Sequence, residues 1–559
     1  MLAKTQQRSQ FAGAYGEAIV SGRRTFRLVA VRRLAALVAT GGLVVAGGVG
    51  GAAPAAASTP INVIVQGASV PVVETLVSSV GGHTITALPL VNGVLAQVPS
   101  STALNLLNTL GLATSPDAPV AVDSLAGALP ASAPTSDSFR NETGATNLAS
   151  TGITGSGVSV AVLDTGIDPL PDFGNRLLGG VDFSGEGNAL QDNFGHGTFI
   201  AGLVAGNGSS SGGAYTGEAT GANLVAVKVA GGTGITDVAK VIQGVSWAIA
   251  NRATYGIKVI NMSLGEVPTG PSQLNPLDQA VEAAWQSGLT VVTSAGNSGN
   301  APGSITAPGD DPDVITVGAL NDAGTVTTAD DSIAGFSGVG PTSANGWLKP
   351  DLVASGKSVV SLLAPGSYIG RTYPGAAVGS SNFVGSGTSF SAAITSGAAA
   401  LVAQENPNAA PDEIKARLLA TATPGPTGDA MQEGHGDLDA FDAANCPPIT
   451  LDQRWSSVAM PSAPGVTIPL LSTWNASSWN AANYSTDPTA SSWNASSWNA
   501  SSWNASSWNA SSWNASSWNA SSWNASSWNA SSWNASSWNA SSWNASSWNA
   551  SSWNASSWN

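Results

Sequence analysis

Between residues 150 and 420, apolar strand-like runs alternate along the chain with segments of helical spacing. The expected strands are Val158–Leu163, Leu224–Val229, Val259–Leu264, Leu289–Ser294 and Val314–Val317, and the expected helices are Thr198–Ala205, Asp237–Ala250, Leu277–Gln286, Ser389–Ala403 and Pro411–Ala420. Such alternation is typical of an α/β fold, in which helices cover both faces of a parallel sheet. Because ligands bind such sheets at the carboxyl ends of the strands, residues at strand ends are the first candidates for a functional site.

Three short segments rich in glycine and threonine each carry one residue of a set that suits hydrolysis. Asp164 follows the first expected strand, His196 lies between two glycines, and Ser389 follows Gly-Thr at the start of an expected helix. A serine hydroxyl is a poor nucleophile until a base takes its proton, and an imidazole serves best when a carboxylate fixes its tautomer. The chain has three histidines, so His196 competes only with His83 and His435. We therefore interpret Asp164, His196 and Ser389 as catalytic residues.

Plainer structural interpretations remain open for these positions. A strand-end aspartate can cap a turn, a histidine can cap a helix, and Ser386 and Ser391 are close rivals of Ser389. The Gly-Thr-Ser context favours Ser389, because a helix N-terminus places backbone N–H groups beside it. Asn297 follows Ser-Ala-Gly after an expected strand, where its amide could donate to the oxyanion of a tetrahedral intermediate. The alternative for Asn297 is an asparagine in a glycine-rich turn.

The chain order Asp, His, Ser and the residues that flank each of them resemble the subtilisin-like (subtilase) serine peptidases over roughly residues 140 to 440. The resemblance implies a subtilisin-like fold and a secreted serine endopeptidase, made as a zymogen, that acts through an acyl-enzyme. It implies that Asp164 orients His196 and that His196 acts as general base and then as general acid. It also implies that Ser389 attacks the peptide carbonyl while Asn297 donates to the oxyanion.

The same resemblance assigns substrate binding to two short segments. They are Ser263, Leu264 and Gly265, and Ser294, Ala295 and Gly296. No charged residue in them is placed to recognise a charged side chain, which indicates a broad or apolar preference. Phe199, Ala393 and Ser355 stand where the family usually has other residues, but none of these departures removes a catalytic group.

Residues 1–57 have the pattern of a secretory signal peptide. A basic lead is followed by the apolar run Leu34–Gly51 and by the small residues Ala52–Ser58, which suit a cleavage site. We therefore expect a secreted protein, extracellular or associated with the cell surface. The alternative is a retained membrane anchor, and the export route stays open.

Residues 58–130 have the spacing of a small unit with the order β-α-β-β-α-β. Its expected strands are 61–65, 84–88, 93–98 and 120–122, and its expected helices are 72–80 and 101–110. This order resembles the inhibitory propeptide of subtilases, which implies an intramolecular inhibitor that blocks the active-site cleft until it is cleaved. An unrelated small domain is the alternative. We expect maturation between about 123 and 140, and the peptidase domain over 131–445.

Charge and cysteine content exclude several other classes of protein. The formal net charge is −15 and no basic stripe runs through the body of the chain, which argues against a nucleic-acid partner. Cys446 is the only cysteine, so neither an intrachain disulfide nor a multi-cysteine zinc site can form. No cofactor is expected for the chemistry. A structural calcium could take its oxygen ligands from Asp168, Asp172, Asp182, Glu186 and Asp192, and solvated carboxylates are the alternative.

After a linker at 446–490, the chain ends in a repeat tail at 491–559 whose unit is Ser-Ser-Trp-Asn-Ala. A period of five suits neither a helix nor a strand, because successive tryptophans would wrap around a helix or alternate on a strand. We weigh a flexible low-complexity tail against a solenoid with five residues per face. Since tryptophan stacks on sugar rings, a cell wall or a polysaccharide is the expected partner.

Three functions compete for the whole chain. The first is the secreted endopeptidase, whose partners are protein or peptide substrates. The second is a catalytically inactive subtilase fold used for adhesion, in which the tail carries the adhesive function. The third is another serine hydrolase such as an esterase, which the absence of a Gly-x-Ser-x-Gly elbow around Ser389 argues against. The presence of every expected catalytic residue favours the first.

Overall fold

The computed structural model describes residues 60–122, 138–299 and 301–449, and the backbone of strands between 473 and 558. The expected signal peptide at 1–57 and most of the expected maturation segment, residues 123–137, lie outside the described residues. Within the part of the chain that is described, no helix has both the length and the apolarity to cross a membrane.

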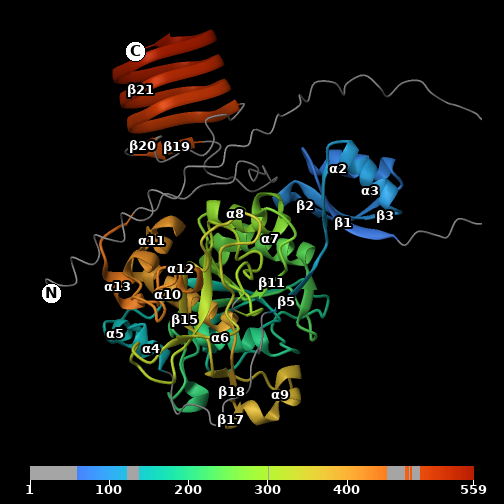
Figure 1. Cartoon of the computed structure of the whole chain (residues 1–559), viewed down its shortest axis with the longest axis vertical. Helices are drawn as coiled ribbons and strands as arrows, with labels where there is room; N and C mark the ends of the chain where they lie inside the picture. Colours follow the sequence, from blue (N-terminus) through green and yellow to red (C-terminus); the bar gives the residue numbers. More distant parts are fainter. Residues whose placement is uncertain are drawn as a thin grey trace, which may run out of the picture. The chain divides into compact units, whose positions relative to one another are not determined.

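The N-terminal unit is an antiparallel sheet with two helices packed on one face, blue in Figure 1. Its elements are β1 (Ile61–Gln66), α2 (Val70–Ser79), β2 (His83–Leu88), β3 (Gly93–Val98), α3 (Ser101–Thr109) and β4 (Ala113–Pro116), and the sheet order is β2-β3-β1-β4. Val63 and Val65 of β1 pack with Val73 and Leu107 of the two helices, while Ile64 belongs to the core of the main unit. Successive side chains of β1 point to opposite faces of this sheet, so one face packs on the two helices and the other on the main unit.

One expected strand of the N-terminal unit lies elsewhere. Val120–Val122 was expected to complete the small sheet, but the fourth strand is β4, and β5 (Pro119–Val122) pairs with strands of the main unit. The expectation was wrong because β4 is a short edge strand with the sequence Ala-Thr-Ser-Pro, which lacks the apolar alternation that marks a strand. Val120 and Val122 have that alternation, since they are buried while Pro119 and Ala121 are exposed.

The main unit is built on a largely parallel sheet, as expected from the alternation of its elements. Within the described residues the sheet has eight strands, in the order β14-β13-β12-β10-β6-β8-β7 with β15 also paired to β13. They are β6 (Ser159–Asp164), β7 (Leu177–Asp182), β8 (Asn223–Lys228), β10 (Ile257–Met262), β12 (Thr290–Ser294), β13 (Ile315–Asn321), β14 (Ser332–Ile333) and β15 (Leu352–Ser355). Only β14 runs antiparallel to its neighbour. All residues of β6 and β12 are buried, as in a sheet covered on both faces.

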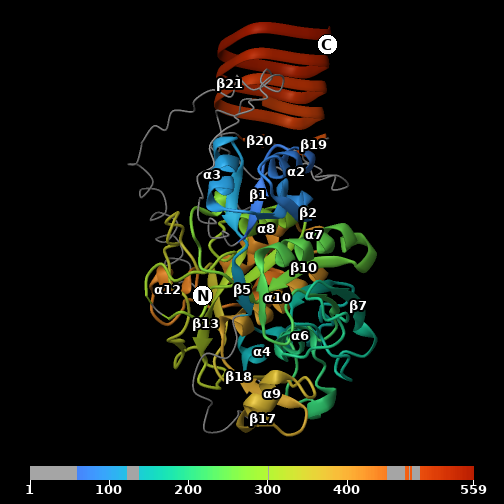
Figure 2. The same cartoon turned by 90° about the vertical axis from the view of Figure 1, so that its right-hand side faces the viewer.

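Helices cover both faces of this sheet. Figure 2 shows α7 (Val238–Tyr255) and α8 (Pro276–Gln286) on one side of β10, and α6 (His196–Ala205) and α10 (Thr388–Glu405) on the other. The first two pack on each other, and so do the last two. Residues Thr388–Ala403 of α10 are buried throughout, and most are alanine, serine or glycine, which lets the helix lie close to β10, β12 and β13. The helices α11 (Pro411–Thr421) and α13 (Ala440–Asn445) pack against α10.

Two small antiparallel sheets lie beside the large one. In the first, β5 is held between β9 (Ile235–Asp237) and β11 (Leu264–Gly265). In the second, β16 (Val359–Leu362), β18 (Asn382–Gly385) and β17 (Ala377–Val378) lie side by side, and β18 leads into α10. Short helices complete the described part of this unit. They are α4 (Phe139–Glu142), α5 (Ala145–Ser150), α9 (Tyr368–Thr372) and α12 (Ala430–Glu433).

The expected linker contains two short strands, β19 (Thr473–Ala476) and β20 (Trp479–Asn480), and the repeat tail has extended backbone in β21 (Ser492–Trp558), all drawn in red in Figure 1. Strand β21 pairs in parallel with both short strands. In this register Trp474 lies opposite Trp498, and Trp479 lies opposite Trp503. Equivalent positions of the repeat are therefore stacked, as a solenoid requires.

Candidate active site

Asp164 and His196 are brought together by the end of one strand and the start of one helix. Asp164 is the last residue of β6, and His196 is the first residue of α6. Nδ1 of His196 lies 2.8 Å from Oδ1 and 2.9 Å from Oδ2 of Asp164, and both side chains are buried. Gly197 permits this approach, because a Cβ atom there would lie 2.1 Å from the carbonyl oxygen of Gly166. The carboxylate can therefore hold the imidazole with its Nδ1 protonated and Nε2 as the basic atom.

Thr165 and Asp192 hold this pair in place. The backbone N–H of Thr165 donates to Oδ1 of Asp164 at 2.8 Å, and its hydroxyl donates to Asp192 at 2.8 Å. Asp192 also accepts from the N–H groups of Gly195 at 2.7 Å and Thr198 at 2.8 Å, so it satisfies backbone donors at the start of the helix that begins at His196. Burial raises the pKa of Asp192, and these donors oppose that rise.

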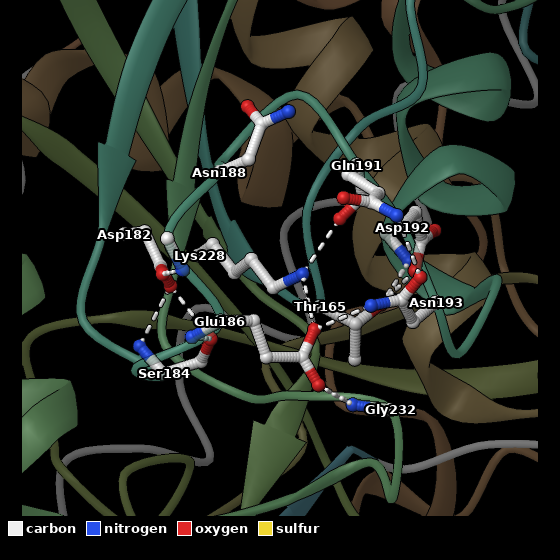
Figure 3. A network of polar contacts seen from close by, with 12 residues as sticks. Thr165, Asp182, Ser184, Glu186, Asn188, Gln191, Asp192, Asn193, Lys228 and Gly232 are labelled. Carbon is white, nitrogen blue, oxygen red and sulfur yellow. Dashed lines mark hydrogen bonds and ion pairs between the residues drawn. The ribbon is translucent and has the colours of Figure 1, made fainter.

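A buried lysine anchors the loop that carries Asp192, as Figure 3 shows. Nζ of Lys228 donates to the carbonyl oxygen of Gln191 at 2.6 Å and lies 2.7 Å from Oε2 of Glu186. Glu186 in turn accepts from the N–H of Gly232 at 2.7 Å and from the amide of Asn193 at 2.8 Å. The ammonium group thus links the end of β8 to the loop that leads into α6.

The acidic residues from which a calcium site was expected already accept protein hydrogen bonds. Asp168 accepts from the N–H of Asp192, Asp172 from Ser210, Asp182 from Ser184 and Gly187, and Glu186 from the groups just described. Within the described residues, no three of them bring carboxylate oxygens within 4.8 Å of one another. A calcium bound by this set stays a prediction.

Ser389 is the second residue of the long buried helix α10 and is itself fully buried. Its Oγ donates to the carbonyl oxygen of Ser263 at 3.3 Å, and Oγ of Ser263 donates back to the carbonyl oxygen of Ser389 at 2.9 Å. The rival serines have structural partners: Oγ of Ser386 accepts from the N–H of Ser358, and Oγ of Ser391 donates to the carbonyl oxygen of Ala354.

The imidazole of His196 lies beside the start of α10. Its ring centroid is 6.1 Å from that of Phe390, the residue after Ser389, and Phe390 packs on Phe199 of α6 with centroids 4.4 Å apart. This aromatic contact ties the helix of the base to the helix of the serine. Nε2 of His196 is buried and has no hydrogen-bond partner among the described residues.

Of the other histidines, His83 lies on β2 of the N-terminal unit and His435 follows α12.

Asn297 is fixed by the residue that precedes Ser389. Its Oδ1 accepts from the backbone N–H of Thr388 at 2.9 Å and from the hydroxyl of Thr388 at 3.0 Å. Because the amide is planar, this pairing also sets the direction of its NH₂ group. Ser294, Ala295 and Gly296 lead from β12 to Asn297, and the carbonyl oxygens of Ala295 and Gly296 accept from the N–H groups of Thr306 and Gly338.

The remaining expected substrate residues pair with β5, the strand that follows the N-terminal unit in the chain. Leu264 and Gly265 form β11 and pair antiparallel with Val122 and Ala121 of β5. On its other edge, Val120 of β5 pairs with Thr236 of β9. The main unit thus binds an extended segment of its own chain, directly beside Ser263 and Ser389.

Sequence reasoning missed the residues that position the expected catalytic ones. Thr388, Thr165 and Asp192 contact Asn297, Asp164 and the helix of His196, and none of them was singled out for this role. The N-cap position of that helix is Gly195, so no capping motif marked Asp192 either. Thr388 contacts a residue 91 positions away, and the hydroxyl of Thr165 bonds to Asp192, 27 positions away.

Comparison with known proteins agrees with this architecture. The Subtilase family matches residues 155–436. The chain is 44% identical to the serine protease AprX of Bacillus subtilis (strain 168) over 271 residues, which cover 48% of this chain and 61% of that protein. It is 39% identical to subtilisin Savinase of Lederbergia lenta over 272 residues, which cover 49% of this chain and 86% of that protein.

A solved structure is also similar. The crystal structure of fervidolysin from Fervidobacterium pennivorans, a keratinolytic enzyme related to subtilisin, superposes with a TM-score of 0.56 at 22% sequence identity. The match covers 72% of this chain and 63% of the fervidolysin chain, and at 22% identity it supports the fold alone. The family match, the similarity to Savinase and the shared fold show that the chain belongs to the subtilase family of subtilisin-like serine peptidases.

Proposed function

We propose that this protein is a secreted serine endopeptidase, made as a zymogen, in which Asp164, His196 and Ser389 carry out the chemistry. The observation that carries the proposal is the buried pair of Asp164 and His196 beside the first turn of the helix that holds Ser389. The relatives that are named proteases support the reaction class.

In the proposed reaction, Nε2 of His196 takes the proton of Ser389 while Oγ attacks the carbonyl carbon of the scissile peptide bond. Asp164 stabilises the imidazolium that forms, and the oxyanion of the tetrahedral intermediate accepts a hydrogen bond from the amide of Asn297. His196 then gives its proton to the leaving amine, and an acyl-enzyme remains on Ser389. A water molecule, activated by His196, hydrolyses this ester and restores the serine.

The zymogen part of the proposal rests on the strand that occupies the expected substrate segment. Val122 and Ala121 pair with Leu264 and Gly265, as a bound peptide would, and the N–H of Val122 donates to the carbonyl oxygen of Gly234 at 3.0 Å. A segment held in this way competes with substrate, so the N-terminal unit acts as an intramolecular inhibitor until it leaves. Val120 and Val122 are buried while Ala121 between them is exposed, which favours substrates with apolar side chains at alternate positions.

Secretion and the role of the tail are parts of the same proposal. The signal-peptide pattern at 1–57 supports export, and the repeated tryptophans support contact with a cell wall or a polysaccharide. Binding of the full chain and of a chain shortened at 446 to insoluble cell-wall polysaccharide would test the tail: loss of binding on truncation supports it, and equal binding contradicts it.

The activity is tested by hydrolysis of casein and of peptide anilides by the secreted protein and by its Ser389→Ala variant, with mass spectrometry of each N-terminus. We expect the wild type to cleave substrate and to lose its N-terminal unit, and the variant to do neither. The control is Ser391→Ala, which removes a neighbouring hydroxyl of the same helix. A folded, fully processed wild type without cleavage would contradict the proposal and favour the adhesion hypothesis.

A further inference from the structure

A group of buried carboxylates lies away from the catalytic residues, between α8 and the turn that leads into β13. Glu282 comes from α8, and Asp311 and Asp313 come from the turn. One carboxylate oxygen of each lies within 4.8 Å of the other two, and all three side chains are buried. Asp310 and Asp278 extend the group and are also buried.

Several oxygens of this group have no hydrogen-bond donor among the described residues. These oxygens are both carboxylate oxygens of Asp278, Oε2 of Glu282, Oδ1 of Asp310 and Oδ2 of Asp311. Asp278 and Asp311 are 0% exposed, so water in bulk cannot serve them instead. Burial of a carboxylate without a donor costs several kcal/mol, so this many together need a positive partner.

The spacing along α8 directs its oxygens toward one place. Asp278, Glu282 and Gln286 stand four residues apart and therefore lie along one face of the helix. Oε1 of Gln286 is a further buried oxygen with no donor among the described residues. The other wall is the turn, where Oδ1 of Asp311 accepts from the N–H groups of Asp313 and Val314 and leaves Oδ2 to face the group.

The two nearest lysines neutralise this group only in part: their charges lower the pKa of Asp311 against the effect of burial, but their ion pairs go to Asp351. Lys415 donates to the carbonyl oxygens of Pro312, Asp313 and Val314 at 2.9, 3.1 and 3.0 Å, and it lies 3.3 Å from Oδ1 of Asp351. Lys349 donates to Val314 and forms a 2.6 Å ion pair with Asp351. Both ammonium groups are therefore bound to carbonyl oxygens and to a carboxylate outside the group. Burial, and then the neighbouring carboxylates of Asp310 and Asp311, raise the pKa of Asp278.

We propose that Glu282, Asp311 and Asp313, supported by Asp278, bind a hard divalent cation between α8 and the turn before β13. Carboxylate and amide oxygens are the ligands that Ca²⁺ prefers, and an oxygen-only shell excludes the soft transition metals. The cation would link two segments that enter neighbouring strands, because α8 leads into β12 and the turn leads into β13. This proposal does not depend on the peptidase activity, and it uses none of the five acidic residues from which calcium was expected.

The test uses the full chain with Ser389→Ala, so that self-digestion cannot change the sample, after removal of metal with EDTA. Calcium binding is measured by isothermal titration calorimetry, and the melting temperature is measured with and without Ca²⁺. In this background we expect Ca²⁺ to bind and to raise the melting temperature. With Glu282→Gln and Asp311→Asn added, we expect one fewer Ca²⁺ per chain and no calcium-dependent shift from this site.

Two further variants keep the proposal falsifiable. Asp278→Asn removes one supporting charge and should weaken Ca²⁺ binding at least tenfold in a folded protein. Asp331→Asn changes another acidic group, formed by Glu142, Asp331 and Asp437, and should leave this binding step unchanged. Equal Ca²⁺ binding by the double variant and its background would overturn the proposal. The proposal would also be overturned if the Ser389→Ala chain bound no Ca²⁺ and the double variant had the higher melting temperature. That result would mean that protons, rather than a cation, neutralise the buried carboxyl groups.

Discussion

Oδ1 of Asn297 accepts two hydrogen bonds from Thr388, the residue directly before Ser389. The expected oxyanion donor and the expected nucleophile are thus fixed to each other through one residue. The contact couples the loop after β12 to the first turn of α10, so that the two groups can act on the same carbonyl.

Replacement of Asn297 by alanine should lower kcat by about 10²–10³-fold with little change in KM, because the donor acts on charge that develops only in the transition state. Thr388→Val keeps the backbone N–H and removes only the hydroxyl that holds the amide. We expect it to lower kcat by about tenfold, the equivalent of about 1.4 kcal/mol. Steady-state kinetics on a peptide anilide measure both variants. A change confined to KM would contradict the assignment of Asn297.

Asp164→Asn should keep the fold and lose most of the activity. An amide of the same shape can still contact Nδ1 of His196, but it no longer selects the tautomer in which Nε2 is basic, and the loss in kcat is about 10⁴-fold in such triads. Circular dichroism should show an unchanged fold. The matched control is Asp168→Asn, since the asparagine oxygen can still accept from the backbone N–H of Asp192, and this variant should lose little activity. Near-normal activity of Asp164→Asn would remove Asp164 from the mechanism.

Lys228→Met should weaken the loop before α6 and, through it, the position of His196. The variant keeps the apolar stem of a fully buried side chain and removes the charge that joins Glu186 to Gln191. Loss of one partner of a buried ion pair costs about 3–5 kcal/mol, and the 31% exposure of Glu186 reduces this cost. We expect a lower melting temperature together with a lower kcat. Lys240→Met, which breaks a surface pair with Asp237, is the control and should change neither.

The large elements of the main unit could be predicted from the sequence because each carries its own periodicity. The expected helix 389–403 is α10 over Thr388–Glu405, and the expected strand 158–163 is β6 over Ser159–Asp164. The predicted α/β fold class is confirmed by the largely parallel sheet and the helices on both of its faces. β4 was not predicted because its sequence, Ala-Thr-Ser-Pro, has no alternation of apolar and polar residues.

The site could be predicted only as far as its motifs reach. Asp164, His196 and Ser389 were predicted from their flanking residues, but the Thr388 contact to Asn297 joins positions 91 residues apart, which no local pattern encodes. The carboxylates around Glu282 were missed for a related reason. Their residues look like ordinary acidic surface positions until the fold buries them together.

The maturation bond follows from the register between β5 and β11. Leu264 lies opposite Val122 and Gly265 lies opposite Ala121, so an antiparallel strand continued by one residue would bring residue 123 opposite Ser263. The carbonyl oxygen of Ser263 accepts from Oγ of Ser389. We therefore expect self-cleavage after Asp123, so that the mature chain begins at Ser124. Mass spectrometry of the processed N-terminus checks this, and a mature chain that begins several residues later would show that β5 does not set the bond.

The N-terminal unit should dock more tightly at acidic than at neutral pH, because of Asp117. Its carboxylate accepts from the N–H of Ala239 at 3.0 Å, and burial raises its pKa to about 6. Asp237 and Glu266 carry negative charge near it, and Lys240 carries positive charge. A carboxyl whose pKa is higher when docked than when free binds a proton on docking. Docking therefore strengthens as the pH falls through about 6 and is weaker above it.

Asp117→Asn tests this dependence, because the asparagine oxygen can still accept from Ala239 while its charge no longer changes with pH. After self-cleavage, the lag before full activity reports release of the N-terminal unit, and we expect a longer lag at pH 5 than at pH 7.5 in the wild type. Comparing each variant with the wild type at the same pH removes the pH dependence of catalysis itself. In Asp117→Asn the difference between the two lags should shrink, and Glu74→Gln, a change on α2, should leave it intact. An Asp117→Asn protein with the full wild-type difference would show that another group controls release.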